Sequence, residues 1–261
     1  MQSQLHKFIN SFACVLILFS AGVSAETVED EGADVAAAEA AAEEAAEEAG
    51  PANALEALKG FIAEAKEDGR IDLEQDTWRT QLPKFPAVAF EAGGTYVWTL
   101  ETSEGVMEAE LMPEVAPDHV RNILYLSQLG FYDGLKFHRI IPGFMAQGGC
   151  PLGRGTGGPG YSLPLEVNRD ALHDVAGTLS MARSARPDSA GSQFFITFGV
   201  TRNLDMQYSV FGRVTEGLDV VRKLEAAGNP NPRSNGVPPL KEIHIERATV
   251  AWRAGEAAES E

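Results

Sequence analysis

The feature that most constrains the fold is a series of short apolar runs, separated by glycine-rich turns, between residues 96 and 250. Runs of this length that are bounded by turn residues are typical of β-strands. The expected strands cover residues 96–100, 106–111, 136–141, 144–147, 178–182, 193–198, 210–214 and 243–250. The first two flank the turn Ser103-Glu104-Gly105, which predicts an opening β-hairpin.

Two segments between these strands carry apolar residues at the spacing of a helix instead. Pro117 suits the first turn of one helix, which should end at Gly130. The other helix is expected over residues 217–227, where leucine and valine fall on one side. Many short strands, with two helices that can cover the ends, predict a mainly β fold in the form of a closed antiparallel barrel.

The chain before residue 93 has a different composition. Residues 26–53 are mostly alanine and glutamate, which favour helix, but they offer no larger apolar stripe for burial. We therefore expect a largely disordered acidic spacer. Apolar residues then recur at helical spacing over residues 54–67, which predicts a short amphipathic helix, followed by a linker to residue 92. This helix either packs against the main domain or serves as a docking or dimerising element.

The first 25 residues have the pattern of a secretory signal peptide. Lys7 precedes an apolar run over residues 12–19, and small residues lead to a cleavage position after Ala25. The apolar run is short for a membrane span. We expect export to the periplasm, or secretion, with no stable membrane insertion after cleavage; the alternative is an uncleaved N-terminal anchor. The acidic residues 253–261 form an expected C-terminal tail.

Charge and cysteine content limit the partners. A formal net charge of −17 argues against nucleic acid, because phosphate binding needs a basic face. After removal of a signal peptide only Cys150 would remain, so no intramolecular disulfide is expected. A reactive thiol at Cys150 is an alternative, but no nearby cysteine and no evident histidine pairing support it. We expect a monomer.

The sequence lacks the usual signatures of metal, nucleotide or nucleophile chemistry. We find no paired metal-ligand spacing, no Walker loop and no Gly-x-Ser-x-Gly elbow, so no metal or cofactor is expected. Residues 153–158 contain four glycines, but they do not lie between the strand and helix of a βαβ unit. A flexible surface loop is therefore preferred over a phosphate-binding loop.

One charged residue falls among apolar residues on an expected strand. Alternation places Phe137, Arg139 and Ile141 on one face of the strand, and His138 with Ile140 on the other. Arg139 is then either a structural ion-pair partner or a charge directed into an apolar cleft. His138, on the opposite face, is interpreted as a packing residue and not as a general base.

Aromatic and amide side chains near Arg139 favour the cleft. Phe144, Met145 and Gln147 follow in the same segment, and residues 191–196 read Gly-Ser-Gln-Phe-Phe-Ile. With these blocks the sequence strongly resembles the cyclophilin family over roughly residues 93–252. The resemblance rests on Phe-His-Arg-x-x-Pro-x-Phe-x-x-Gln-Gly-Gly, Gly155-Thr156-Gly157-Gly158, Leu179-Ser180-Met181-Ala182, Gly-Ser-Gln-Phe-Phe-Ile and Val210-Phe211-Gly212.

The resemblance implies a closed eight-stranded antiparallel barrel capped by two helices, with peptidyl-prolyl cis-trans isomerase activity on its outer face. It assigns the catalytic role to Arg139. It also implies substrate-binding residues of three kinds: an apolar proline pocket, hydrogen-bonding amides, and a backbone segment that holds the substrate chain. These correspond to Phe144, Met145, Phe195 and Leu204, to Gln147 and Gln193, and to Ala182 and Arg183 with Ser184.

The expected substrates are proline-containing polypeptides, and the chemistry needs no nucleophile. Rotation about an X-Pro bond is slow because resonance stiffens the amide, with a barrier of about 18–20 kcal/mol. In the twisted state the proline nitrogen carries a localised lone pair. A guanidinium such as that of Arg139 can donate a hydrogen bond to this nitrogen and so favour the twisted state.

The sequence departs from the best-known animal members at three positions of the site. Asn203 stands where those members carry a tryptophan that helps to bind cyclosporin, so we expect weaker inhibition. Tyr208 stands in place of a histidine and can supply a ring contact and a hydroxyl. Arg183 replaces an asparagine, as in bacterial members, and is either a backbone-binding residue or a solvated loop charge.

Two other functions stay open at this point. The domain could be a non-catalytic module that binds or chaperones proline-containing peptides with the same pocket. Alternatively, the chain could be a scaffold whose acidic N-terminal arm is the functional part.

Overall fold

The structure is a computed structural model that describes residues 53–255. The expected signal peptide, nearly all of the acidic spacer and the last six residues of the expected tail lie outside the described residues. Those expectations therefore stay predictions.

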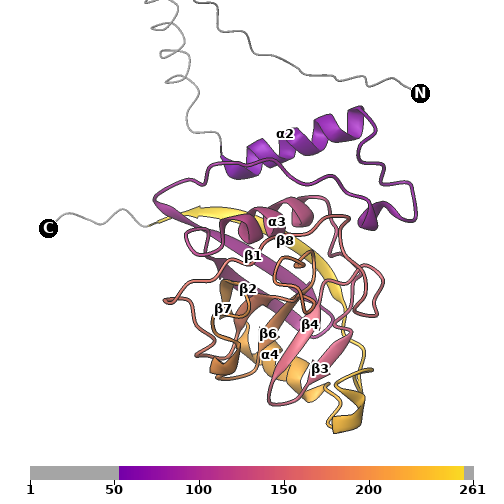
Figure 1. Cartoon of the computed structure of the whole chain (residues 1–261), viewed down its shortest axis with the longest axis vertical. Coiled ribbons are helices and arrows are strands. Elements are labelled where there is room, and N and C mark those ends of the chain that lie inside the picture. Colours follow the sequence, from indigo (N-terminus) through magenta and orange to yellow (C-terminus); the bar gives the residue numbers. More distant parts are fainter. Residues whose placement is uncertain (1–52, 256–261) are drawn as a thin grey trace, which may run out of the picture. The chain divides into compact units, whose positions relative to one another are not determined.

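All eight expected strands are confirmed, and they form one antiparallel sheet (Figure 1). The order across the sheet is β3-β4-β6-β5-β7-β2-β1-β8. The strands are β1 (Gly94–Thr102), β2 (Gly105–Leu111), β3 (Arg139–Ile141), β4 (Met145–Gly148), β5 (Thr178–Met181), β6 (Phe194–Thr197), β7 (Val210–Glu216) and β8 (Ile245–Ala254). The expected hairpin joins β1 and β2, with Thr102 paired to Gly105.

The two outermost strands of the curled sheet, β3 and β8, do not form a ladder with each other. The segment that precedes β3 makes only a few bonds to the start of β8, including an isolated bridge between Lys136 and His244. The amide of Phe137 donates to the carbonyl of Ile243 at 3.0 Å. The sheet is thus a curled half-barrel, and full closure of the barrel stays a prediction.

The two expected helices lie at opposite ends of the curled sheet (Figure 1). They are α3 (Pro117–Gln128), with Pro117 in its first turn, and α4 (Leu218–Ala226). The core is built around Trp98, whose ring lies 4.9 Å from that of Phe194 and whose Nε1 donates to Ser127 Oγ at 2.9 Å. A dense aromatic interior of this kind fixes the side of the sheet that faces inward.

The expected amphipathic helix is α2 (Ala54–Glu67), and it packs against α3. Leu58 is fully buried, the Phe61 ring lies 5.9 Å from that of Tyr125, and Gln128 Nε2 donates to the carbonyl of Leu55 at 3.0 Å. Of the two alternatives for this helix, the structure shows the first. Within residues 53–255 no helix is both long and apolar enough to cross a membrane.

The segment expected to be a linker is packed against the domain. Residues 78–85, which we call the N-terminal strap, include the short 3-10 helix η1 (Trp78–Thr80). Arg79 donates to the carbonyls of Phe131 and Asp133 at 2.9 and 3.0 Å. Leu82 is buried, and its amide donates to the carbonyl of Pro159 at 2.9 Å. The strap therefore reaches the glycine-rich loop that is described below.

Candidate active site

The register of three strands brings the central side chains of the site together. Arg139 on β3 is the direct partner of Gln147 on β4, and Gln147 is the direct partner of Phe195 on β6. Directly paired residues in a sheet point to the same face. An arginine, an amide and an aromatic ring therefore lie side by side on one face of the sheet.

The prediction that Phe137 lies on the same strand face as Arg139 and Ile141 is wrong. Phe137 is fully buried in the main core, 6.0 Å from the ring of Phe194, whereas Arg139 and Ile141 are half-buried on the other face. The reason is that β3 begins only at Arg139, so strict alternation does not extend back to Phe137. His138 is also buried and faces Gly155, and it is not among the residues that line the cavity beside Arg139, which fits the packing role predicted for it.

A small apolar cluster, separate from the main core, lies beside Arg139. Met145, Phe195 and Leu204 are buried in it, and Phe144 and Tyr208 pack against them. The cluster encloses an open cavity of about 170 Å³, which we call the proline pocket. Its lining consists entirely of residues that the sequence analysis assigned to the site, namely Arg139, Phe144, Met145, Gln147, Ala182, Arg183, Phe195, Leu204 and Tyr208.

Arg139 is held by neutral acceptors only. Its Nη1 donates to Gln147 Oε1 at 3.2 Å, its Nη2 to Asn235 Oδ1 at 2.8 Å, and its Nε to the Asn235 carbonyl at 3.1 Å. No carboxylate pairs with it among the described residues. Burial lowers the pKa of Arg139, yet an arginine stays protonated at neutral pH. The structural ion pair considered for Arg139 is therefore absent from this part of the chain.

Asn235 was not found from the sequence. It ends the 3-10 helix η3 (Pro232–Ser234) with a φ of +50°, and Gly236 follows with a φ of +76°. The Gly236 carbonyl accepts from the Ile140 amide at 3.0 Å, and a Cβ on Gly236 would lie 2.6 Å from the Ile140 carbonyl oxygen. The Asn-Gly pair signals a turn. Nothing in the sequence shows that this turn meets Arg139, which lies 96 residues away.

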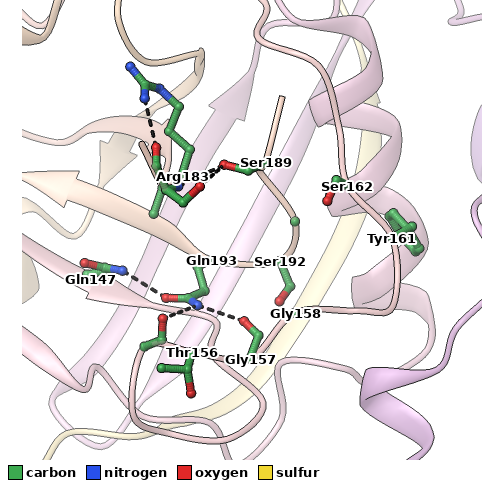
Figure 2. Close-up of a pocket in the computed structure, with 14 residues that line it drawn as sticks. Gln147, Thr156, Gly157, Gly158, Tyr161, Ser162, Arg183, Ser189, Ser192 and Gln193 are labelled. Carbon is green, nitrogen blue, oxygen red and sulfur yellow. Dashed lines mark hydrogen bonds between the residues drawn. The ribbon is translucent and has the colours of Figure 1, made fainter. Parts of the chain in front are cut away.

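Gln193 and Ser184, the other assigned residues, line a second cavity, which Figure 2 shows. This cavity measures about 360 Å³ and shares Gln147, Ala182 and Arg183 with the proline pocket. Gln147 Nε2 donates to Gln193 Oε1 at 2.9 Å. Gln147, Ala182 and Arg183 therefore form the wall that the cavities share, and Gln193 holds Gln147 from the side of the second cavity. One amide hydrogen of Gln147 and a lone pair on each side-chain oxygen remain available to a peptide backbone, whereas both amide hydrogens of Gln193 are bonded to the carbonyls of Gly155 and Gly157.

The glycine-rich loop of residues 153–158 forms the floor of the second cavity (Figure 2). Gln193 Nε2 donates to the carbonyls of Gly155 and Gly157 at 3.0 and 2.8 Å. The amides of the same two glycines donate to the sulfur of Cys150, which is fully buried, at 3.2 and 3.3 Å. The expected flexible surface loop is thus tied to the site from both sides.

A histidine that the sequence reasoning missed supports the proline pocket from behind. His173 is fully buried and stacks on Phe195, with ring centroids 6.1 Å apart, while the edge of Tyr208 contacts the same ring. Asp205 accepts from the His173 amide at 2.8 Å and pairs with Arg202. Partial burial would raise the pKa of Asp205, but these bonds lower it to about 2. Asp205 thereby fixes the side chain of His173 behind Phe195.

The site offers charge, amides and apolar contact, and no nucleophile lines either cavity apart from serine and threonine hydroxyls without an adjacent base. In the described residues no three His, Cys, Asp or Glu side chains lie close enough together to hold a metal ion. Such a site can bind an apolar ring and polarise an atom beside it without forming a covalent bond.

Comparisons with known proteins agree with this geometry. The family model described as cyclophilin type peptidyl-prolyl cis-trans isomerase/CLD matches residues 97–250. A peptidyl-prolyl cis-trans isomerase of Synechococcus elongatus is 53% identical over 127 residues, which are 48% of this chain and 86% of the relative. Peptidyl-prolyl cis-trans isomerase B of Bacillus subtilis is 46% identical over 140 residues, or 54% and 90% of the two chains.

A solved structure is similar as well. The crystal structure of a Cryptosporidium parvum cyclophilin type peptidyl-prolyl cis-trans isomerase has a TM-score of 0.56 and 31% identity, covering 60% of this chain and 98% of the other. Fold and site define a β-sheet domain with an apolar pocket beside an arginine that has no acidic partner. The chain belongs to the cyclophilin-type peptidyl-prolyl cis-trans isomerases.

Proposed function

We propose that this isomerase accelerates X-Pro rotation in exported proteins, with Arg139 as the catalytic residue. The observation that carries the proposal is the position of Arg139, which is charged, lacks a carboxylate partner among the described residues and lines the apolar pocket. In the twisted state the proline nitrogen gains a localised lone pair, and Arg139 donates to it. A charged donor that is already oriented favours this state over both planar isomers.

The other residues hold the two sides of the bond differently. Phe144, Met145 and Phe195 contact the pyrrolidine ring in the proline pocket. Gln147 and Gln193 hydrogen-bond the backbone of the peptide, as does the chain near Ala182. One side of the X-Pro bond then turns while the other is fixed. A Cryptosporidium parvum relative has been solved in the presence of the dipeptide Ala-Pro, which supports a proline-containing ligand.

The location is proposed from the sequence. Residues 1–25 would direct export, and the periplasm is the proposed compartment, with secretion as the alternative. The substrates would then be polypeptides that fold after export. N-terminal sequencing of the mature protein from cell fractions tests this, and Glu26 is expected as the first residue.

Arg139→Ala tests the catalytic role. We expect kcat/KM for an X-Pro peptide, measured by NMR exchange or a protease-coupled assay, to fall by about 100-fold or more. Arg222→Ala is the matched control, because Arg222 lies exposed on α4 and lines neither cavity. Full activity of Arg139→Ala would remove the catalytic assignment. Absence of turnover in the wild-type protein would instead favour a non-catalytic peptide-binding module.

A further inference from the structure

The charged side chains that line the two adjoining cavities are all positive. Among the residues that line them, the charged side chains are Arg139 and Arg183, and no aspartate or glutamate is present. This differs from the chain as a whole, which has a formal net charge of −17. A bound peptide therefore meets a local electrostatic environment opposite in sign to that of the molecule.

Arg183 lies at the wall that the two cavities share. Figure 2 shows it at the second cavity. Its Nε donates to the Gln207 carbonyl at 2.8 Å, and its Nη1 donates to the Ser184 carbonyl at 2.9 Å. Its guanidinium carbon lies 4.7 Å from the centroid of the Tyr208 ring. These contacts orient the side chain without neutralising it, because every partner is uncharged.

Acidic side chains near Arg183 in sequence or beside the proline pocket already have partners of their own. Asp174, nine residues away, pairs with Arg213 at 2.9 Å. Asp188, five residues away, accepts from the Leu165 amide at 3.2 Å. Asp205 accepts from His173 and pairs with Arg202. No ion pair within residues 53–255 includes Arg183. The guanidinium is therefore oriented, half-exposed and free to pair with a carboxylate from outside the chain.

We propose that Arg183 is a specificity-determining residue, through which the isomerase prefers peptides with an acidic side chain one or two residues from the proline. The inference rests on the proposed function of the pocket. Residues of an extended peptide are spaced by about 3.3 Å, so a neighbour of the bound proline lies within reach of the shared wall. A guanidinium pairs well with a carboxylate, and two of its hydrogen bonds can form at once.

The expected preference is modest, because Arg183 is half-exposed. Charge pairs in such positions change binding by a factor of about two to five, and salt weakens them. The effect should appear in kcat/KM, since the contact is made on binding. It should not alter the rotation step, for which Arg139 is responsible.

The test uses peptides that differ only by Asp, Asn or Lys at one of three positions: two before the proline, directly before it, or directly after it. NMR exchange gives kcat/KM for each peptide with the full chain at low and high salt. At one position or more we expect the order Asp, Asn, Lys, with a twofold to fivefold advantage of Asp over Asn that shrinks at high salt.

Variants distinguish this role from a structural one. Arg183→Gln should remove the advantage of Asp while leaving turnover of the Asn peptide measurable, and Arg183→Lys should restore part of it. Arg222→Gln removes the same charge elsewhere and should change nothing. Equal rates for Asp and Lys peptides in the wild type, or an advantage that persists in Arg183→Gln, overturns the inference. If the proposed function itself is wrong, the wild-type protein will not turn over any of the peptides, including the Asn peptide.

Discussion

Arg139 and Asn235, 96 residues apart in the chain, share two hydrogen bonds, one to the Asn235 side chain at 2.8 Å and one to its carbonyl at 3.1 Å. The pair fixes the guanidinium at the edge of the proline pocket. A hydrogen-bond donor that is held in place before the substrate twists stabilises the twisted state better, because no free energy is then needed to orient the donor during the reaction. We therefore expect Asn235 to act as a positioning residue for Arg139, the proposed catalytic donor.

Two substitutions at Asn235 separate its side-chain bond from its backbone conformation. Asn235→Gly keeps the positive φ and the carbonyl but removes Oδ1, so we expect kcat to fall about threefold to tenfold with little change in stability. Asn235→Ala should lose the same activity and also lower the free energy of unfolding by about 1 kcal/mol, because alanine is strained at a φ of +50°.

Activity assays and urea unfolding of both variants give the comparison. If Asn235→Gly keeps full kcat, the side-chain bond does not position Arg139.

The sequence allowed the strands and helices to be predicted because their signals are local. Each strand is a short apolar run between turns, and α2 and α3 show helical periodicity with a clear start. Errors arose where tertiary pairing decided the geometry. Phe137 was placed on the face of Arg139, but its backbone pairs with Ile243 and its ring enters the core.

The assigned site residues came from ordered family motifs, and the structure gathers them around two cavities. The residues that support them carry no local signal. Asn235 and His173 contact the site through long-range folding, and Gly155 and Gly157 take part through backbone atoms alone. Single-sequence reasoning cannot find backbone contacts of this kind, because any residue type can make them.

Cys150 connects the core to the second cavity. Its sulfur accepts the amides of Gly155 and Gly157, whose carbonyls hold Gln193. Cys150→Ala leaves two partly buried amides without an acceptor, so we expect the free energy of unfolding to fall by about 1 kcal/mol and KM to rise. Cys150→Ser keeps an acceptor and should have a smaller effect on both quantities, as measured by urea unfolding and steady-state kinetics.

The same residue permits a check on the alternative of a reactive thiol. Burial alone would raise the pKa of Cys150, but the amides that point at its sulfur, that of Gly157 first, lower it. Because the side chain is fully buried, a thiol reagent should modify it slowly in the native protein and rapidly in urea. Rapid labelling of the native protein would contradict a purely structural role.

His138 should make stability depend on pH without affecting catalysis. Burial, and then the charge of Arg139, lower the pKa of His138 to about 4. In the unfolded chain a histidine takes up a proton near pH 6.5. As the pH falls from about 6.5 to 4, the unfolded state binds more protons than the native state, so the free energy of unfolding decreases.

His138→Gln should reduce this pH dependence and leave kcat near its wild-type value at pH 7. His244→Gln is the control, because the His244 side chain is 43% exposed and is not part of the pocket lining. Urea unfolding at several pH values measures the slope for each protein. A large loss of kcat in His138→Gln would show that His138 does more than pack.

The N-terminal strap lies outside residues 97–250, which match the family, yet it bonds to Pro159, the neighbour of Gly158 in the second cavity. Arg79 ties it to the carbonyls of Phe131 and Asp133, and Leu82 binds Pro159 beside the glycine-rich loop.

Arg79→Ala leaves both carbonyls unpaired, so we expect the free energy of unfolding to fall by about 1–2 kcal/mol and KM to rise with kcat unchanged. Arg70→Ala is the matched control, because Arg70 is exposed and contacts Glu64, Asp68 and the Phe61 ring, all near it in sequence and none in the binding site. Exposed contacts of this kind contribute little. Equal kinetic effects of the two variants would mean that the strap does not support the binding site.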